Sequence, residues 1–447
     1  MTKYFGTDGV RGVANVSLKP EMAFKLGRCG GFVLTNGSTE YAKVVVARDT
    51  RASGEMLVSS LISGLLSVGV DVENVGVITT PALSFLIKKF DLSAGIMISA
   101  SHNPAQDNGI KFFGTDGNKL SDQMEDKIEK LIDAKEDDLP RPSAKGLGKI
   151  ISFPGALESY VSFLHGYAKD YNKSLNIMLD TANGAGSKVA PSLFETLNLN
   201  YEIMSDHPDG ININDKVGST HPEKLIETVK TQGFDAGFAI DGDGDRCIAV
   251  DEFGNIVDGD KIMYIISSYF KSKGELAGNT VVTTVMSNIG LYKALDKAGI
   301  DYQVTAVGDR YVSENMFKNG FVIGGEQSGH IILRNYHNTG DGLLTMIVLL
   351  NIMFDEGKTL SELASPVKTY PQKLVNIKVQ DKNSWENCSV LQDKIKEIEK
   401  KMAGDGRVLI RPSGTENLLR VMVEASTDEL VNNYVDELVK IVEQELS

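Results

Sequence analysis

The chain has 447 residues, with 46 Lys and Arg against 60 Asp and Glu, which gives a formal net charge of −14. This length predicts about three domains, and the composition, 42% hydrophobic and 24% charged, is that of a globular protein. An acidic chain lacks the broad basic footprint of a nucleic-acid or membrane-surface binder, so neither partner is expected. A small anionic substrate stays open, because a local field can oppose the net charge.

Secretion and membrane insertion are also disfavoured. The cysteines Cys29, Cys247 and Cys388 are too widely spaced for a disulfide framework or a metal-binding pair. The opening MTKYFGTDGVRG lacks a signal-peptide pattern, and the longest apolar run, around Met346–Phe354, is too short to cross a bilayer. These features predict a soluble cytoplasmic protein.

Short β-branched runs that end abruptly in Gly, Asp or Ser recur along the chain. They are typical of strands buried on both faces. The runs are Lys43–Arg51, Ala94–Pro104, Asn176–Gly186, Ala236–Arg246, Thr280–Asn288, Tyr302–Arg310 and Phe321–His330. Amphipathic helices are predicted between them, for example at Met124–Ala134 and Pro222–Thr231. The alternation predicts parallel sheets, with ligands gathered at the carboxyl ends of the strands.

Two stretches mark changes of organisation. Lys135–Gly148 is rich in charge, Pro and Gly and is interpreted as a linker or surface loop, and a second change comes near Ala364–Gln372. Beyond it we expect a small α+β domain that ends in a helix capped around Ser426 or Thr427. The apolar face of that helix is Leu430, Val431, Tyr434, Val435, Leu438 and Val442.

The densest acidic cluster is Asp241-Gly-Asp243-Gly-Asp245-Arg246, after the apolar run GFAI. Three carboxylates on alternate positions of a glycine-containing loop can converge on one hard dication, and without it they repel one another. An EF-hand is disfavoured, although Glu252 is the twelfth residue of a loop that begins at Asp241, because Arg246 stands where the turn needs glycine. The remaining alternative is an Asp-Gly hairpin turn at the surface. We predict a Mg²⁺ site.

A second cluster is Ser99-Ala-Ser101-His102-Asn103-Pro104, after the strand-like GIMI. A serine at the carboxyl end of a strand can act as a nucleophile, although the G-x-S-x-G elbow of α/β-hydrolases is absent. His102 need not face Ser101, because neighbouring side chains usually diverge. Lys111, ten residues after Ser101, is a candidate acid, base or charge partner. Taken alone, the cluster also fits a polar turn, and Lys111 a solvated lysine.

Two more polar clusters follow. The segment from Gly324 to His330, GGEQSGH, offers donors and acceptors suited to sugar hydroxyls, and it fits a polar turn with one satisfied histidine equally well. Arg411-Pro-Ser413-Gly414-Thr415-Glu416 combines an arginine, two hydroxyls and glycine amides, which is typical of a phosphate site. Because LLRVMVE after it alternates like a strand, the alternative is a β-hairpin loop, and no helix N-terminus supplies the positive field.

In this order and spacing, the four clusters resemble those of the α-D-phosphohexomutase family, and the resemblance runs over the whole chain. In that family the ASHNP loop carries a phosphoserine, the DGDGDR loop binds Mg²⁺, GEQSGH binds the sugar and RPSGTE a phosphate. FGTDGVRG (Phe5–Gly12) and GEQSGH are similar to bacterial members that interconvert glucosamine 6-phosphate and glucosamine 1-phosphate, on the route to UDP-N-acetylglucosamine and the cell wall. One departure is Asn417, where relatives usually have Pro, and it bears on the stiffness of the loop.

The resemblance implies an α/β fold of three similar mixed-sheet domains and a smaller C-terminal α+β domain around a central cleft. The expected boundaries are 1–150, 151–252, 253–366 and 367–447. Each domain would supply one loop, in the order phosphoserine, metal, sugar and phosphate. A homodimer is implied as well.

The resemblance also implies a mechanism. Phospho-Ser101 would pass its phosphoryl group to a phosphohexosamine, and the bound 1,6-bisphosphate would turn and return a phosphate to Ser101. Glucose or glucosamine 1,6-bisphosphate is expected as intermediate or activator. Lys111 and His330 are candidates for general base and acid, with no choice made between them, and Arg11 and Arg246 would neutralise charge.

The ligand sets follow from the same resemblance. One Mg²⁺ is expected at Ser101, Asp241, Asp243 and Asp245. The substrate-binding residues would be Arg246, Glu326, Ser328, Arg411, Ser413, Gly414 and Thr415.

Two other interpretations stay open. The chain could be a phosphomannomutase/phosphoglucomutase of the same family, or a phosphosugar-binding protein without turnover. In each case three acidic charges would be committed to a dication. The basic side chains expected at the site, Arg11, Lys111, Arg246 and Arg411, then make it locally positive despite the net charge of −14.

Overall fold

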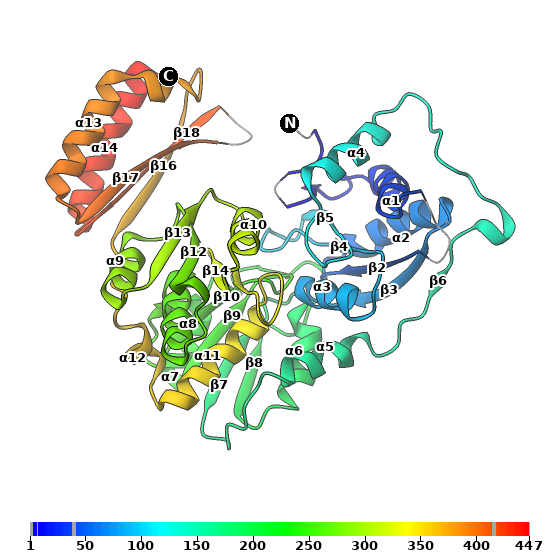
Figure 1. The fold of residues 1–447 in the computed structure, drawn as a ribbon, viewed down its shortest axis with the longest axis horizontal. Coiled ribbons are helices and arrows are strands. Elements are labelled where there is room, and N and C mark those ends of the chain that lie inside the picture. Colours follow the sequence, from blue (N-terminus) through cyan, green and yellow to red (C-terminus); the bar gives the residue numbers. More distant parts are fainter. Residues whose placement is uncertain (1–2, 7, 38–41, 414–416, 447) are drawn as a thin grey trace. The chain divides into compact units, whose positions relative to one another are not determined.

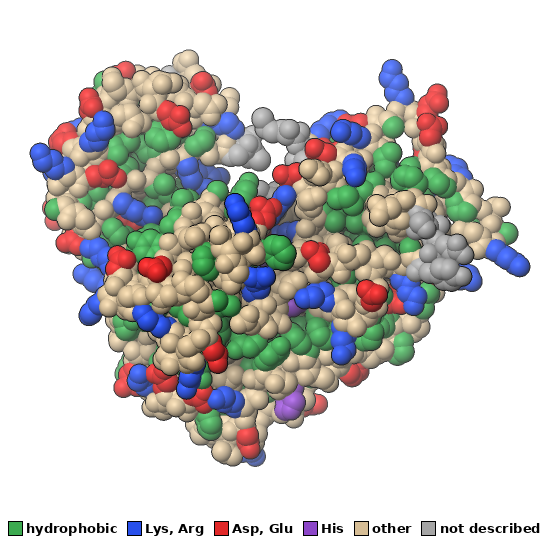
Figure 2. Space-filling model, viewed as in Figure 1, with side chains coloured by type: hydrophobic (Ala, Val, Ile, Leu, Met, Phe, Trp, Pro, Cys, Tyr) green, Lys and Arg blue, Asp and Glu red, His purple; other side chains and the backbone are tan. Residues whose placement is uncertain are grey.

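The structure is a computed structural model, and it describes residues 3–6, 8–37, 42–413 and 417–446 (Figure 1). The chain forms two compact units. The first comprises Met1–Met286 and Ile300–Ser365, and the second comprises Ser287–Gly299 and Pro366–Ser447. Figure 2 shows acidic and basic side chains interspersed over the face in view. Cys29, Cys247 and Cys388 are all free thiols, as predicted.

The first sheet has the order β1-β5-β4-β2-β3-β6 among the described residues. Its strands are β1 (Val10–Val13), β2 (Lys43–Arg48), β3 (Asp71–Val77), β4 (Ala94–Ile98), β5 (Asp107–Phe113) and β6 (Ile150–Ile151). Strand β2 is parallel to β3 and β4, whereas β5 is antiparallel to β4 and β1. The chain therefore reverses once inside an otherwise parallel sheet.

Helices cover both faces of this sheet. They are α1 (Pro20–Leu34), α2 (Ser53–Ser67), α3 (Thr80–Lys89) and α4 (Asp122–Ile132). Ala94, Ile96 and Ile98 of β4 belong to the core that α1, α2 and α4 share, whereas the intervening Gly95 faces Leu83 and Ile87 of α3 (Figure 1). Strand β4 is thus buried on both sides, as its unbroken apolar run predicts.

The second sheet, in the order β11-β10-β9-β7-β8, repeats this plan. Its strands are β7 (Asn176–Asp180), β8 (Asn200–Met204), β9 (Ala236–Ile240), β10 (Cys247–Asp251) and β11 (Ile256–Val257), and its helices are α5 (Ala156–His165), α6 (Gly186–Phe194) and α7 (Glu223–Gln232). Strand β7 is parallel to β8 and β9, and β10 is antiparallel to β9 and β11. The strands that flank the acidic loop exclude an EF-hand, which needs helices there.

The third sheet has the order β13-β12-β14-β15. It comprises β12 (Thr280–Thr284), β13 (Asp301–Thr305), β14 (Ile323–Gly325) and β15 (Ile331–Leu333), with helices α8 (Gly259–Lys273), α10 (Asp309–Asn319), α11 (Gly342–Glu356) and α12 (Leu360–Ala364) in the same unit. The run around Met346–Phe354 lies in the buried helix α11. Among the described residues, no helix is long and apolar enough to span a membrane.

The second unit contains an antiparallel sheet in the order β16-β18-β17. Its strands are β16 (Gln372–Lys378), β17 (Gly406–Pro412) and β18 (Leu418–Ala425), and its helices are α9 (Ile289–Ala298), α13 (Ser389–Met402) and α14 (Asp428–Glu445). Thr427 caps α14 by accepting a hydrogen bond from the Leu430 amide, as predicted. On the predicted apolar face of α14, Leu430 is half-buried and the other five residues are buried.

The architecture confirms the predicted fold class and corrects one inference. Three mixed sheets with helices, followed by a smaller antiparallel domain, replace the purely parallel sheets that the alternation predicts. Each predicted strand is shorter than its apolar run, because the polar end of the run forms a loop. In β4–β5, β9–β10 and β14–β15 this loop is a reversal too short for a helical crossover, so the next strand runs antiparallel.

The loop expected at Lys135–Gly148 is largely exposed and contains only the 3-10 turn η1 (Ala144–Gly146). Buried Arg28 of α1 attaches its beginning to the sheet domain. The guanidinium binds Asp137 at 2.7 and 3.0 Å and donates to the carbonyls of Leu139 and Pro140 at 2.9 and 3.2 Å. It also donates to the Ser67 carbonyl at 3.2 Å.

We expect Arg28→Met to lower the free energy of unfolding by about 2–4 kcal/mol, because it leaves several carbonyl groups without a donor. Denaturant titration would measure the loss. The control is Arg141→Met, since Arg141 also pairs with Asp137 but its side chain is 64% exposed, and a change below about 0.5 kcal/mol is expected there. Equal losses in the two variants would contradict this role for Arg28.

Candidate active site

The four polar clusters all lie where the chain reverses between two antiparallel strands. Ser101 lies between β4 and β5, the three aspartates between β9 and β10, and Glu326–His330 between β14 and β15. These three loops belong to the first unit. The RPSGTE loop joins β17 to β18 in the second unit, which supports the hairpin interpretation of that segment. Within the first unit, the reversals bring side chains together that are far apart in sequence.

Ser101 is 2% exposed and adopts a left-handed backbone conformation, with φ of 53°. Its hydroxyl donates to Asp241 Oδ2 at 2.6 Å, across 140 residues of sequence. The hydroxyl also lies 3.2 Å from His102 Nδ1, so these neighbouring side chains do face each other, which the sequence alone left open. The left-handed backbone turns the two side chains toward each other.

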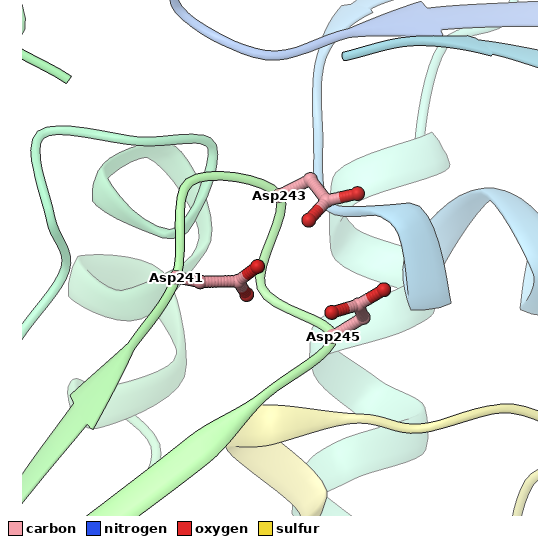
Figure 3. Close-up of side chains that lie close together, drawn as sticks. All are labelled: Asp241, Asp243 and Asp245. Atoms are coloured by element: carbon pink, nitrogen blue, oxygen red, sulfur yellow. The ribbon is translucent and has the colours of Figure 1, made fainter. Parts of the chain in front are cut away.

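Asp241, Asp243 and Asp245 form one buried group, with a ligand oxygen from each within 4.8 Å of the others. Figure 3 shows the three carboxylates close together, with that of Asp241 directed toward those of Asp243 and Asp245. A Cβ at Gly242 would lie 2.6 Å from the Ser101 carbonyl oxygen, so the glycine permits the close contact of the two loops. The loop is a hairpin turn, but a buried one rather than the surface turn considered above.

The residues present fit a hard dication. Asp243 Oδ1 and Asp245 Oδ1 are buried and have no hydrogen-bond partner among the described residues. Burial, together with repulsion from Asp245 and Asp243, raises the pKa of Asp241 well above its usual value. A dication would relieve this repulsion, and an all-oxygen set of donors suits Mg²⁺.

Lys111 lies on β5 and is 1% exposed, so it is not the solvated lysine that the sequence alone allows. Its ammonium donates to Asp243 Oδ2 at 2.8 Å and pairs with Asp8 at 3.0 Å. Although burial lowers its pKa, these carboxylates raise the pKa above the usual value, so the group carries a proton. Thr80 Oγ1 also donates to Asp243 Oδ2, at 2.6 Å.

His330 is buried between two carboxylates. Its Nδ1 lies 3.6 Å from Asp245 and its Nε2 lies 3.6 Å from Asp309. Burial lowers its pKa, but Asp245 and Asp309 together raise the pKa to about 9. When the ring is neutral, Nε2 can accept a hydrogen bond from the Gly340 amide at 3.2 Å, with the ring proton on Nδ1 next to Asp245.

The positive charges of Arg11 and Arg246 act on the Ser101 loop. Burial, followed by the charges of Arg246 and Arg11, lowers the pKa of His102 to about 4, so this ring is neutral at pH 7. The Arg246 amide donates to Asp241 Oδ1 at 3.2 Å. The Arg11 guanidinium pairs with Asp8, and Nε of each arginine has no hydrogen-bond partner among the described residues.

Sequence reasoning missed Asp8, Lys119 and Asp309. Lys119 Nζ lies 2.5 Å from Asp8 and 2.7 Å from Asp309, and thereby joins the first sheet domain to α10. A signal was present for both aspartates, since Asp8 lies in FGTDG and Asp309 is the next-to-last residue of the Tyr302–Arg310 run. Asp8 and Asp309 add two carboxylates to the group. Without an ion, the charges of Asp8, Asp241, Asp243, Asp245 and Asp309 offset those of Arg11, Arg246, Lys111, Lys119 and His330, and a bound dication would make this group positive, as expected.

Glu326 and Ser328, of the predicted sugar-binding loop, differ in their hydrogen bonding. Glu326 Oε1 accepts a hydrogen bond from the Gly308 amide at 3.1 Å, at the start of α10. Ser328 Oγ is buried without a hydrogen-bond partner among the described residues. Its hydroxyl is therefore available to a ligand.

In the second unit, Arg411 of β17 lies directly opposite Arg420 of β18. Burial, followed by repulsion from Arg420, lowers the pKa of Arg411, and Nε of both arginines has no hydrogen-bond partner among the described residues. Facing like charges destabilise a sheet unless an anion binds between them, so Arg420 is a further candidate that sequence reasoning missed. Ser413 is buried, and its amide donates to the Leu418 carbonyl. The predicted Gly414 and Thr415 lie outside the described residues.

Models of four successive domains match the chain. They are those of phosphoglucomutase/phosphomannomutase: α/β/α domain I at residues 2–138, α/β/α domain II at 158–254, α/β/α domain III at 258–370 and the C-terminal domain at 374–441. The chain belongs to this family, the α-D-phosphohexomutases. As a phosphohexomutase it is an isomerase.

Curated relatives cover the whole chain. The phosphoglucosamine mutase of Lacticaseibacillus casei is 60% identical over 449 residues, covering 100% of this chain and 99% of the relative. That of Latilactobacillus sakei is 58% identical over 448 residues and covers 100% of both. These relatives confirm the predicted resemblance to the bacterial amino-sugar members of the family.

Solved structures share the fold at lower identity. A phosphoglucomutase/phosphomannomutase family protein from Burkholderia thailandensis superposes with a TM-score of 0.81 at 24% identity, covering 99% of this chain and 98% of that one. Aspergillus fumigatus N-acetylphosphoglucosamine mutase, in complex with GlcNAc-6P and magnesium, gives a TM-score of 0.73 at 18% identity, with 99% and 96% coverage. These similarities show that the chain has the fold of both proteins.

Proposed function

We propose that this phosphohexomutase interconverts glucosamine 6-phosphate and glucosamine 1-phosphate for UDP-N-acetylglucosamine and cell-wall synthesis. The observation that carries the chemistry is the Ser101 hydroxyl, 2.6 Å from Asp241 of the buried three-carboxylate group. The substrate is inferred from the identity of 55–60% with relatives named phosphoglucosamine mutase.

In the proposed reaction, a sugar hydroxyl attacks the phosphorus of phospho-Ser101. The bond from phosphorus to Ser101 Oγ breaks as the new bond to the sugar oxygen forms, and the hydroxyl proton passes to a base. The resulting 1,6-bisphosphate turns in the site, and its other phosphoryl group returns to Ser101. Lys111 and His330 are the candidates for acid and base. Because nearby carboxylates raise the pKa of both groups, either one fits the acid as it stands, and it must first give up its proton to act as the base. Arg11 and Arg246 offset charge on the transferring group.

Asp241, Asp243 and Asp245 would hold Mg²⁺ together with an oxygen of Ser101. When bound, the ion supplies positive charge that stabilises the transferring phosphoryl group. Lys111 and Thr80, which both donate to Asp243 Oδ2, keep Oδ1 of that carboxylate turned away from themselves and free for the ion.

We assign the remaining contacts to substrate recognition. Glu326 and Ser328 would bind sugar hydroxyls in either orientation of the substrate. The phosphate that does not react would be bound by the loop of the second unit, with Arg420 as an added member: Arg411, Ser413, Gly414, Thr415 and Arg420. The free Nε atoms of the two arginines support this assignment.

The decisive experiment compares turnover of the 6-phosphates of glucosamine, glucose and mannose by the same preparation. We expect kcat/KM for glucosamine 6-phosphate to exceed the other two by at least about tenfold, a difference of 1.4 kcal/mol in transition-state binding. A preference for glucose or mannose 6-phosphate would make the protein a phosphoglucomutase/phosphomannomutase. Binding without conversion of any of the three would leave a phosphosugar-binding protein.

The predicted boundaries at 150, 252 and 366 and the central cleft remain proposals. Limited proteolysis would test the boundaries. The homodimer and the cytoplasmic location also remain predictions, and light scattering after size-exclusion chromatography and cell fractionation would test them.

A further inference from the structure

Arg51 is a fully buried arginine beneath the Ser101 loop. It follows β2 in the segment Arg48-Asp49-Thr50-Arg51 and is 0% exposed. Within the part of the chain that the structure describes, its hydrogen bonds and ion pair do not include Asp241, Asp243 or Asp245. Its partners lie on the loop that carries the reactive serine.

The guanidinium of Arg51 donates hydrogen bonds to three carbonyl oxygens of that loop. Nη2 donates to the carbonyls of Ser101 at 3.0 Å and Asn103 at 2.8 Å, and Nη1 donates to that of Pro104. Asn214 Nδ2 donates to the Ser101 and Asn103 carbonyls as well, at 2.9 Å each. Three carbonyl dipoles of one short loop therefore point inward, to two buried donor side chains.

The other side of the guanidinium is fixed by Asp49. Nε of Arg51 donates to Asp49 Oδ2 at 2.8 Å, and the same oxygen accepts from Ser99 Oγ at 2.6 Å. Ser99 Oγ in turn accepts the Ser101 amide at 2.9 Å. The amide and the carbonyl of Ser101 are thus both held by one buried network, which maintains the left-handed conformation that a serine rarely adopts.

We propose that Arg51 is a positioning residue for phosphoryl transfer. It draws the partial negative charge of the loop carbonyls away from the phosphoryl group and holds Ser101 Oγ against Asp241. The inference rests on the proposed role of Ser101 as phosphoryl carrier. Only the planar fork of an arginine can serve the Asp49 carboxylate and three carbonyls at once, so a lysine should not replace it.

Arg28 provides a matched control, because it is also a buried arginine that binds one carboxylate and several carbonyls in the same sheet domain. Its partners lie at the 135–148 loop and at Ser67 of α2, and among the described residues none belongs to the Ser101 loop. A purely structural role for Arg51 predicts that equivalent substitutions of the two arginines change stability and activity alike.

The test compares Arg51→Lys with Arg28→Lys in the full-length protein. We expect both to lower Tm, but only Arg51→Lys to lower kcat, by about 10- to 100-fold with KM changed less than threefold, as for a small misplacement of a reacting group. Single-turnover transfer from isolated phospho-enzyme should slow by the same factor. An unchanged kcat in Arg51→Lys, or an equal loss in Arg28→Lys, overturns the proposal.

Asn214→Ala keeps the proposal testable if Arg51→Lys does not fold, because Asn214 donates to two of the same carbonyls from a different loop. We expect a smaller loss of kcat, about threefold to tenfold, and a changed ³¹P shift of phospho-Ser101. An unchanged kcat and shift would count against the proposal. Intact-mass analysis of the wild type distinguishes a failure of the Arg51 proposal from a failure of the proposed reaction. An active enzyme that carries no phosphate on Ser101 would refute the proposed reaction itself.

Discussion

The Ser101→Ala protein is expected to be isolated with one phosphate fewer than the wild type, because a methyl group cannot carry a phosphoryl group. Its kcat should be at least about 10³-fold lower. The structure supports this expectation through the position of the hydroxyl, which is buried beside Asp241 and is the only side-chain oxygen of residue 101. Intact-mass analysis measures the phosphate, and conversion of glucosamine 6-phosphate measures kcat. The fold should persist, since among the described residues the hydroxyl forms hydrogen bonds with Asp241 and His102 alone.

The control for this substitution is Ser63→Ala on α2. Ser63 is exposed, and its hydroxyl donates only to the Ser59 carbonyl in its own helix. The Ser63→Ala protein should carry the same number of phosphates as the wild type, and its kcat should be unchanged. Mutase activity that persists in Ser101→Ala would refute the phosphoserine mechanism.

Asp243→Asn is expected to abolish Mg²⁺-dependent turnover, with kcat lowered by about 10²- to 10⁴-fold. The amide keeps the shape of the carboxylate but removes the charge that faces Lys111 and the free buried oxygen that could bind the ion. Ion binding should also stabilise the wild type, by about 2.7 kcal/mol at an ion concentration of 100 times Kd. Thermal unfolding with and without MgCl₂ would show a rise in Tm for the wild type and none for Asp243→Asn.

Asp251→Asn serves as the control, because Asp251 lies at the end of β10, where its carboxylate accepts hydrogen bonds from the Phe253 and Asn255 amides and from the Asn255 side chain. Both oxygens of that side chain are satisfied, so Mg²⁺ dependence should be unchanged. A normal Mg²⁺ response in Asp243→Asn would remove the three aspartates from the mechanism. Equal loss in both variants would indicate damage to the hairpin rather than to an ion site.

Much of the fold could be predicted because strands that are buried on both faces consist of unbroken apolar runs, which are visible in the sequence. Strands β4 and β9 are buried at every residue, and each is an unbroken apolar run. Thr427 was identifiable as the cap of α14, since capping depends on local chemistry. The direction of the strand after each polar loop could not be read in the same way, because apolar runs have the same appearance in parallel and antiparallel pairs.

The candidate site was predictable to the extent that its residues stand next to one another in the chain. Asp241, Asp243 and Asp245 belong to one loop, so their meeting follows from local geometry. Lys119, in contrast, is marked by no local sequence pattern. Its role depends on its ion pairs with Asp8 and Asp309, which are distant from it in sequence. Arg420 was missed because only the β17–β18 register places it opposite Arg411.

The sequence by itself determined the chemical types at the ends of the strands: a serine, three carboxylates, a sugar-loop histidine and an arginine-rich reversal. Tertiary structure decided which of them meet. Ser101 reaches Asp241 across 140 residues, and Lys111 reaches Asp243 across 132. The physical reason is desolvation: once antiparallel reversals bury these charged groups, each requires a partner, and the partners lie on other loops brought to the same place.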